Sequence, residues 1–168
     1  MEVNKLPKIN MDKSETDCCP KFDPDPWDDK KIVFDNKQFV QANTFNLFHI
    51  PLNMGRVITK TWKAIQDAEA DLDEYLMLSH DPSMWKGEHF FAVKDKVSGQ
   101  KNVKLSGTYL TKVFEGPFKE AGKWVKEMEK FVESKDKKMK KLYFFYTTCP
   151  KCGKHYGKNY VVGFGQVE

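Results

Sequence analysis

Aromatic and β-branched residues cluster in short stretches along the chain, and polar residues between them mark the turns. Two such stretches, residues 38–50 and 104–115, predict strands. A proline follows each of them, and then apolar residues recur at helical spacing over residues 53–70 and 118–134, which predicts two amphipathic helices. Two further strands are predicted after each helix, over residues 74–79, 88–94, 142–148 and 159–167.

The two strand–helix segments align with each other at a constant offset. Phe48 aligns with Phe114 and Pro51 with Pro117, in both cases 66 residues apart. Apolar agreement at one offset across several elements indicates an internal duplication. We therefore predict an α+β fold of duplicated βαββ units, copy one over residues 31–98 and copy two over 102–168. The units would form a mostly antiparallel sheet with both helices on one face and a groove at the pseudo-twofold axis.

The first 30 residues differ from the rest in composition. They are rich in proline and charge and show no sustained periodicity, which predicts an N-terminal arm that is partly disordered, chiefly over residues 1–16. Phe22 and Trp27 are costly to leave in water, so we expect that part of the arm to pack against the domain.

Charge and hydropathy exclude several classes of function. The 168-residue chain has 28 Lys and Arg against 24 Asp and Glu, and a net charge of +4 argues against nucleic acid as a partner. The basic run over residues 135–141 is interpreted as the solvated end of a helix. No apolar stretch is as long as a membrane span and no signal peptide is visible, so we expect a cytoplasmic protein.

The second copy carries a recognisable set of motifs. Gly107-Thr108-Tyr109 in a strand is followed by Phe114-Glu115-Gly116-Pro117-Phe118 at the turn and by a helix with a central Trp124. With the strand that begins at Tyr143, this pattern resembles the GyrI-like small-molecule-binding family, over residues 32–167. The resemblance implies a duplicated βαββ fold whose interhelical groove binds apolar, often cationic or aromatic compounds. Some stand-alone members are hydrolases that open reactive rings in toxic natural products.

The sequence departs from that family in three respects. No helix-turn-helix segment precedes the domain, which disfavours a transcription regulator. The chain also has the Pro-rich arm and a Cys-x-x-Cys segment between the last two predicted strands. The arm and the Cys-x-x-Cys segment indicate a distinct branch.

Aromatic groove walls and a carboxylate would form the binding site. The aromatic residues at the strand–helix junctions, together with one histidine, are the candidate ligand-binding residues: His49, Trp62, Trp85, Tyr109, Trp124, Tyr143 and Tyr146. A carboxylate among them would attract a cation or act as a general acid or base. Glu88, which opens an aromatic strand, is the first candidate and Glu115 the second. The alternatives are that the Trp residues are core, that Glu88 faces solvent and that Glu115 caps a helix.

The cysteines occur at two places only. Cys149 and Cys152 have zinc-knuckle spacing on a predicted turn, and Cys18 and Cys19 in the arm could complete a tetrahedral site. Inert reduced thiols and a redox pair are the alternatives. A structural zinc is thus the cofactor that the sequence leaves open.

Two functions remain open from the sequence. The first is a protein that binds, and in one version hydrolyses, an apolar or aromatic organic compound in the groove. The second is a zinc-stabilised protein-interaction module without catalytic activity, which predicts an exposed apolar patch. The sequence also leaves open a homo-oligomer.

Overall fold

A computed structural model describes residues 2–9, 14–15, 19–72, 75–148 and 150–168. The chain divides into two compact units. Unit 1 combines Met1–Phe34 with Gly107–Glu168, and unit 2 is Asp35–Ser106. The fold is α+β, with antiparallel strand pairing and few helices in each unit.

Unit 2 contains an antiparallel sheet and one longer helix. The strands pair in the order β2–β1–β4–β3, and the first part of β5 also belongs to this unit. The bounds are β1 (Lys30–Leu47), β2 (Ile50–Pro51), α1 (Met54–Asp67), β3 (Met77–Ser83), β4 (Lys86–Ala92) and β5 (Lys101–Glu115). The residues before Asp35 in β1 and after Ser106 in β5 are part of unit 1.

Helix α1 packs on one face of its sheet. Ile65 is fully buried against Val40, Met77 and Phe91, and Trp62 packs beside them, partly buried. The residues on either side of these three strand residues along the chain are buried as well, so both faces of the strands are buried here. Asn53 precedes the helix but does not cap it, because its carboxamide oxygen accepts a hydrogen bond from the backbone N–H of Phe45 at 2.9 Å.

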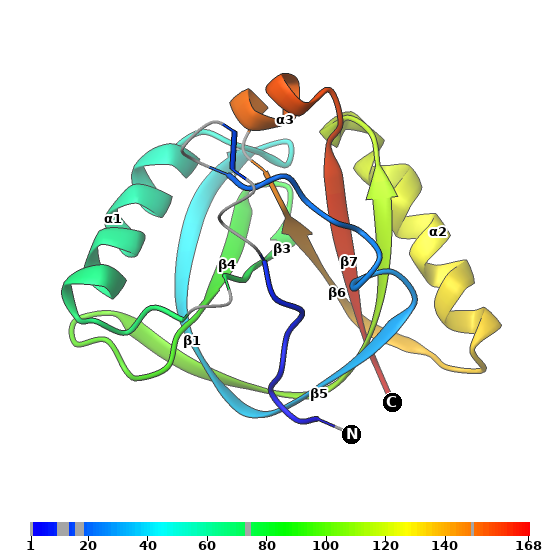
Figure 1. Cartoon of the computed structure of the whole chain (residues 1–168), viewed down its shortest axis with the longest axis horizontal. Coiled ribbons are helices and arrows are strands. Elements are labelled where there is room, and N and C mark those ends of the chain that lie inside the picture. The colour runs from blue at the N-terminus through cyan, green and yellow to red at the C-terminus, as the bar shows by residue number, and fades with distance from the viewer. Residues whose placement is uncertain (1, 10–13, 16–18, 73–74, 149) are drawn as a thin grey trace. The chain divides into compact units, whose positions relative to one another are not determined.

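In unit 1 the strands pair antiparallel in the order β6–β7–β5, with α2 along one face (Figure 1). The further elements are the 3-10 turn η2 (Phe118–Glu120), α2 (Ala121–Ser134), β6 (Met139–Tyr146), α3 (Pro150–Tyr156) and β7 (Tyr160–Val167). Met128 of α2 is fully buried against β7 at Gly163 and Gly165. A Cβ at either glycine would lie 3.0 Å from the end of the Met128 side chain, which would then have to shift by a few tenths of an ångström.

The N-terminal segment covers the other face of this sheet. Trp27 is 1% exposed and its ring lies 5.3 Å from that of Phe145, centre to centre. The Thr111 hydroxyl donates a hydrogen bond to the main-chain oxygen of Trp27 at 2.5 Å. The expected packing of Phe22 and Trp27 is therefore confirmed, since both are buried.

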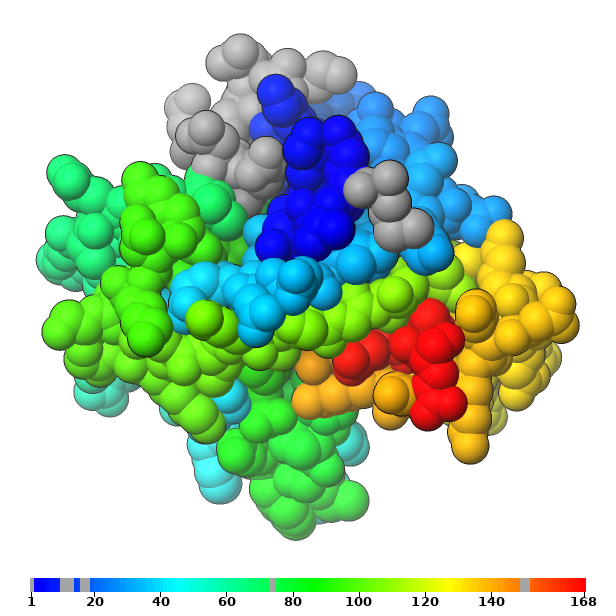
Figure 2. Space-filling view, turned by 90° about the horizontal axis from the view of Figure 1, so that it is seen from below, coloured from blue at the N-terminus to red at the C-terminus, as the bar shows by residue number. Residues whose placement is uncertain are grey.

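The start of the chain packs as well. Val3 pairs with Val33 of β1 in parallel, and the backbone N–H of Asn4 donates to the Val33 oxygen at 2.8 Å. The space-filling view shows these first residues, in blue, lying over the start of β1, in light blue (Figure 2). Leu6 is also buried.

Two sequence predictions about local structure are corrected. The segment after Cys149, expected to be a turn, is the short helix α3, and Pro150 provides the fixed φ that suits the first helical position. The basic run over residues 135–141 is a solvated helix end only in its first half: Lys135 is the C-cap of α2 and residues 135–138 are exposed, whereas β6 begins at Met139. The groove at the pseudo-twofold axis stays a prediction.

Candidate functional site

Polar side chains gather in unit 2 where β1, β4 and β3 pair. The register places Glu88 of β4 opposite Asn43 of β1 and His80 of β3, while the next residue, His89, lies opposite Ala42 and Ser79. Because neighbouring residues of a strand point to opposite faces, Glu88 and His89 belong to two different polar clusters.

The first cluster holds the Glu88 carboxylate. The Gln41 amide nitrogen donates to Oε2 of Glu88 at 3.0 Å and to the Asn43 side-chain oxygen at 3.1 Å. The Lys86 ammonium is 3.8 Å from the same Oε2. Only 19% of the Glu88 side chain is exposed. The hydrogen bond from Gln41 orients its carboxylate. Among the described residues both interactions fall on Oε2, which leaves Oε1 for a water or a substrate.

The second cluster is built around a buried histidine. His89 is 3% exposed; its Nδ1 lies 2.8 Å from the Ser79 hydroxyl and its Nε2 lies 3.0 Å from the Thr44 hydroxyl. Burial lowers the pKa of His89 to about 4, because the charged imidazolium loses its hydration. The ring is therefore neutral near pH 7.

The donor and the acceptor of each hydrogen bond in this cluster follow from the Thr44 hydroxyl. The Thr44 hydroxyl donates its single proton to the Asn46 side-chain oxygen at 2.9 Å, so it accepts from Nε2–H of His89. Nδ1 of His89 then accepts the proton of Ser79. The chain ends on Asp81, whose carboxylate lies 3.4 Å from the Asn46 amide nitrogen. Asp81 also lies 3.4 Å from Nδ1 of His49.

The Ser79–His89 pair has the atoms of a nucleophile and its base, but it lacks access. Ser79 is 6% exposed and His89 3%. The surroundings of Gly87 are also tightly packed, since a Cβ there would be 2.4 Å from the Thr44 hydroxyl oxygen. Because both side chains are buried, a substrate carbon has no access to the Ser79 hydroxyl in this structure, and the pair is best explained as a structural element. The Glu88 carboxylate, on the other face, is the accessible member of the region.

The predicted ligand-binding residues are distributed over both units. Tyr109, Trp124 and Tyr143 are nearly fully buried, whereas Trp62 and Tyr146 are partly buried. Trp124 stacks on Phe114 with ring centres 5.7 Å apart, as a core residue does. Burial raises the pKa of the Tyr109 hydroxyl, and the neighbouring Tyr143 raises it further. The assignment of these residues to a ligand stays a prediction.

The remaining predicted residues differ sharply in environment. Glu115 ends β5 and is exposed, in contrast to Glu88. Cys152 is buried in α3 and Cys19 is partly buried, while Cys18 and Cys149 lie outside the described residues. The described residues contain no group of three or more metal-ligating side chains. Zinc binding by the four cysteines therefore stays a prediction.

An exposed apolar patch marks one end of unit 2. His49 and Trp85 belong to it. The ring centres of Trp85 and Phe48 are 5.3 Å apart, and the backbone N–H of His49 donates to the main-chain oxygen of Met84 at 2.9 Å. Its large apolar side chains are 40–66% exposed: Phe45, Leu47, Phe48, Ile50, Leu52, Met84 and Trp85. Exposed apolar patches often mark sites of interaction with another molecule.

Sequence reasoning missed the partners of both clusters. Gln41, Ser79 and Thr44 are ordinary strand residues in the sequence, and only the strand register brings them to Glu88 and His89. The one visible signal was the polar residues inside aromatic strands, at Glu88 and His89 in particular.

A family model described as bacterial hydrolase matches residues 9–167. The chain belongs to this bacterial hydrolase family. No curated protein matches the chain. Membership of the bacterial hydrolase family does not test the more specific resemblance to the GyrI-like family, which stays a prediction.

A solved structure shares the fold of this hydrolase-family protein. An uncharacterized conserved protein from Listeria innocua is similar with a TM-score of 0.61 and 13% identity, over 84% of this chain and 92% of that one. A structure of SAV2435 bound to tetraphenylphosphonium aligns with a TM-score of 0.45 and 13% identity, over 84% of this chain and 94% of that one. At this identity the Listeria protein shows a common fold alone. No described helix of the hydrolase-family protein has the length and apolar content to cross a bilayer.

Proposed function

We propose that this protein hydrolyses an organic small molecule with Glu88 as the catalytic carboxylate. The observation that carries the proposal is the orientation of Glu88, whose Oε2 is held by Gln41 at 3.0 Å while Oε1 has no described partner. Membership of a hydrolase family supports the reaction class. The exposed position of Glu115 makes it the weaker of the two candidates.

The chemistry follows from the carboxylate. Oε1 of Glu88 accepts a proton from a water molecule as the water oxygen bonds to an electrophilic carbon of the substrate. The bond from that carbon to the leaving atom breaks, and the leaving atom takes a proton from the carboxylic acid or from solvent. Gln41 is a positioning residue, since its amide fixes Oε2 and so aims Oε1.

The resemblance to the GyrI-like family extends the proposal to the substrate. We infer an apolar or aromatic electrophile, such as an ester or a strained ring, because some members of that family open reactive rings.

The experiment is a hydrolysis assay with 4-nitrophenyl acetate as an ester probe and styrene oxide as an epoxide probe. The wild-type protein should hydrolyse at least one of them, and Glu88→Gln should lower kcat by about 100-fold or more. The amide is isosteric and can still accept a hydrogen bond from Gln41, so the fold should persist. Turnover that is unchanged in Glu88→Gln would overturn the role of this residue.

The exposed patch favours a second candidate function, which is self-association through the end of unit 2. Burying side chains such as Phe48 and Ile50, 64% and 66% exposed, against a second copy would remove apolar surface from water. Light scattering after size exclusion should then show a dimer that Phe48→Ser converts to a monomer. A monomeric wild-type protein at high concentration would contradict this candidate.

A further inference from the structure

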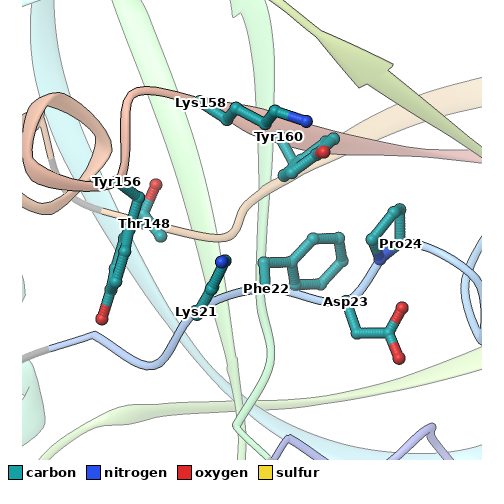
Figure 3. Close-up of a pocket in the computed structure, with 8 residues that line it drawn as sticks. All are labelled: Lys21, Phe22, Asp23, Pro24, Thr148, Tyr156, Lys158 and Tyr160. Carbon is teal, nitrogen blue, oxygen red and sulfur yellow. The ribbon is translucent and has the colours of Figure 1, made fainter. Parts of the chain in front are cut away.

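A pocket of about 430 Å³ lies within unit 1, between the N-terminal segment, the end of β6, α3 and the start of β7 (Figure 3). Pockets that bind organic ligands usually measure about 300–1,000 Å³. All the residues that line this pocket belong to unit 1, and none of them takes part in the Glu88 or His89 cluster. Its chemistry can therefore be considered on its own.

Three aromatic rings form the apolar part of the wall. Phe22 and Tyr160 lie with ring centres 5.8 Å apart. Tyr156 is held in place through its hydroxyl, which donates to the Cys19 oxygen at 2.7 Å and accepts from the Glu15 N–H at 3.0 Å. Because its hydroxyl is already engaged, Tyr156 offers the pocket chiefly its ring. Such walls suit a planar aromatic ligand.

The charged part of the wall is mainly positive. Lys21 and Lys158 line the pocket, and neither forms an ion pair or a side-chain hydrogen bond within the described ranges of the chain. Asp23 also lines it and accepts a hydrogen bond from the Asp25 N–H at 3.1 Å. Figure 3 shows the Lys21 ammonium directed toward the space between Thr148 and Phe22, whereas the Asp23 carboxylate points away.

A buried polar atom adds an independent observation. Thr148 lines the pocket and is 6% exposed, and its hydroxyl is buried without a hydrogen-bond partner among the described residues. An unsatisfied buried hydroxyl is costly, and a polar group of a bound molecule would restore its hydrogen bond.

We propose that this pocket binds an aromatic anion, such as an aryl carboxylate. The rings of Phe22, Tyr156 and Tyr160 take the aromatic part, and the ammonium groups of Lys21 and Lys158 attract the anionic group. The ligand differs in class from the neutral electrophiles proposed for Glu88. Binding here requires no turnover, so it can be tested independently of the hydrolysis.

The test is titration calorimetry of the full chain with 2-naphthoate and with 2-naphthylmethanol, a neutral compound of the same ring system. The wild-type protein should bind 2-naphthoate at least tenfold more tightly. The double variant Lys21→Met/Lys158→Met should lose that preference and bind both compounds alike. The matched control, Lys137→Met/Lys138→Met, removes the same charge from exposed positions after α2 and should keep the preference.

Three results would overturn the proposal. They are equal affinity of the wild-type protein for both compounds, a preference that survives in the pocket variant, and an equal loss in the control variant. Salt provides a check that needs no variant: sodium chloride at 0.5 M should weaken the binding of 2-naphthoate and leave that of 2-naphthylmethanol nearly unchanged. A 2-naphthoate affinity that is insensitive to salt would also contradict the role of the lysines.

Discussion

The Ser79 hydroxyl donates a hydrogen bond to Nδ1 of His89 across 2.8 Å, inside the sheet of unit 2. Both residues are buried, and the opposite ring nitrogen of His89 is engaged by Thr44. The histidine is therefore fixed in its neutral form with both nitrogens satisfied. Changes to this pair should therefore alter the free energy of unfolding rather than a catalytic rate.

The first prediction concerns pH. The unfolded chain protonates His89 near pH 6.5, but the folded protein resists until about pH 4, so the unfolded state binds more protons in that window. Stability should thus fall as pH drops from 6.5 to 4, by about 3 kcal/mol from this residue. Urea denaturation at several pH values measures it. His89→Gln should flatten this part of the profile, while the exposed His155→Gln should not; equal profiles for both variants would refute the assignment.

The second prediction concerns the crowding beside His89. Gly87→Ala should destabilise the protein by more than about 1 kcal/mol, because the new Cβ would meet the Thr44 hydroxyl oxygen at 2.4 Å. Gly55→Ala in α1 is the matched control. Nothing lies within 4 Å of its new Cβ, and alanine in a helix should stabilise by about 0.5–1 kcal/mol. Thermal unfolding compares the two, and a loss at neither position would contradict the packing around Thr44.

The third prediction uses two adjacent threonines. The Thr147 hydroxyl donates to the Tyr160 oxygen at 2.7 Å, whereas that of Thr148 is buried without a described partner. Thr147→Val should therefore cost about 1 kcal/mol, and Thr148→Val should raise the free energy of unfolding by a similar amount. Chemical denaturation without ligand decides between them. Changes of the same sign would mean that the two hydroxyls do not differ as the structure shows.

The fourth prediction concerns the N-terminal segment. Trp27→Ala should destabilise by about 3–5 kcal/mol, since this 1% exposed ring packs on Phe145 and Phe164. Trp85→Ala, at a residue 48% exposed, should cost less than about 1 kcal/mol. Urea denaturation measures the change in the free energy of unfolding for both variants. If the two substitutions cost the same, the segment is not part of the core of unit 1.

Much of the secondary structure could be predicted from the sequence because its periodicity is strong. The apolar stripes placed α1 and α2 to within a few residues, and Phe22 and Trp27 were correctly expected to pack. The helix α3 was missed because its Cys-x-x-Cys spacing suggested a metal-binding turn. Its boundary signals were present in Pro150 and in Gly157, which has a positive φ of 72° just after the helix.

Only part of the candidate site could be predicted from the sequence. Glu88 could be chosen because a carboxylate at the start of an aromatic strand is unusual. Its partner Gln41 is 47 residues away, and the link depends on the register between β1 and β4, which sequence patterns fix poorly. The same holds for Ser79 and His89 on β3 and β4. In addition, the alignment of apolar residues between the two copies does not predict how deeply each residue is buried. Trp124 is buried, whereas Trp62 is only partly buried.

If Glu88 performs the hydrolysis, the ratio of kcat in Glu88→Gln to that in Glu115→Gln shows it most directly. Each variant replaces one carboxylate by its amide on a probe that the wild-type protein hydrolyses. Glu115→Gln should keep near wild-type turnover, and Glu88→Gln should lose about 100-fold or more in kcat. Equal rates in the two variants, with loss instead in Ser79→Ala, would contradict it and move the chemistry to the buried histidine cluster.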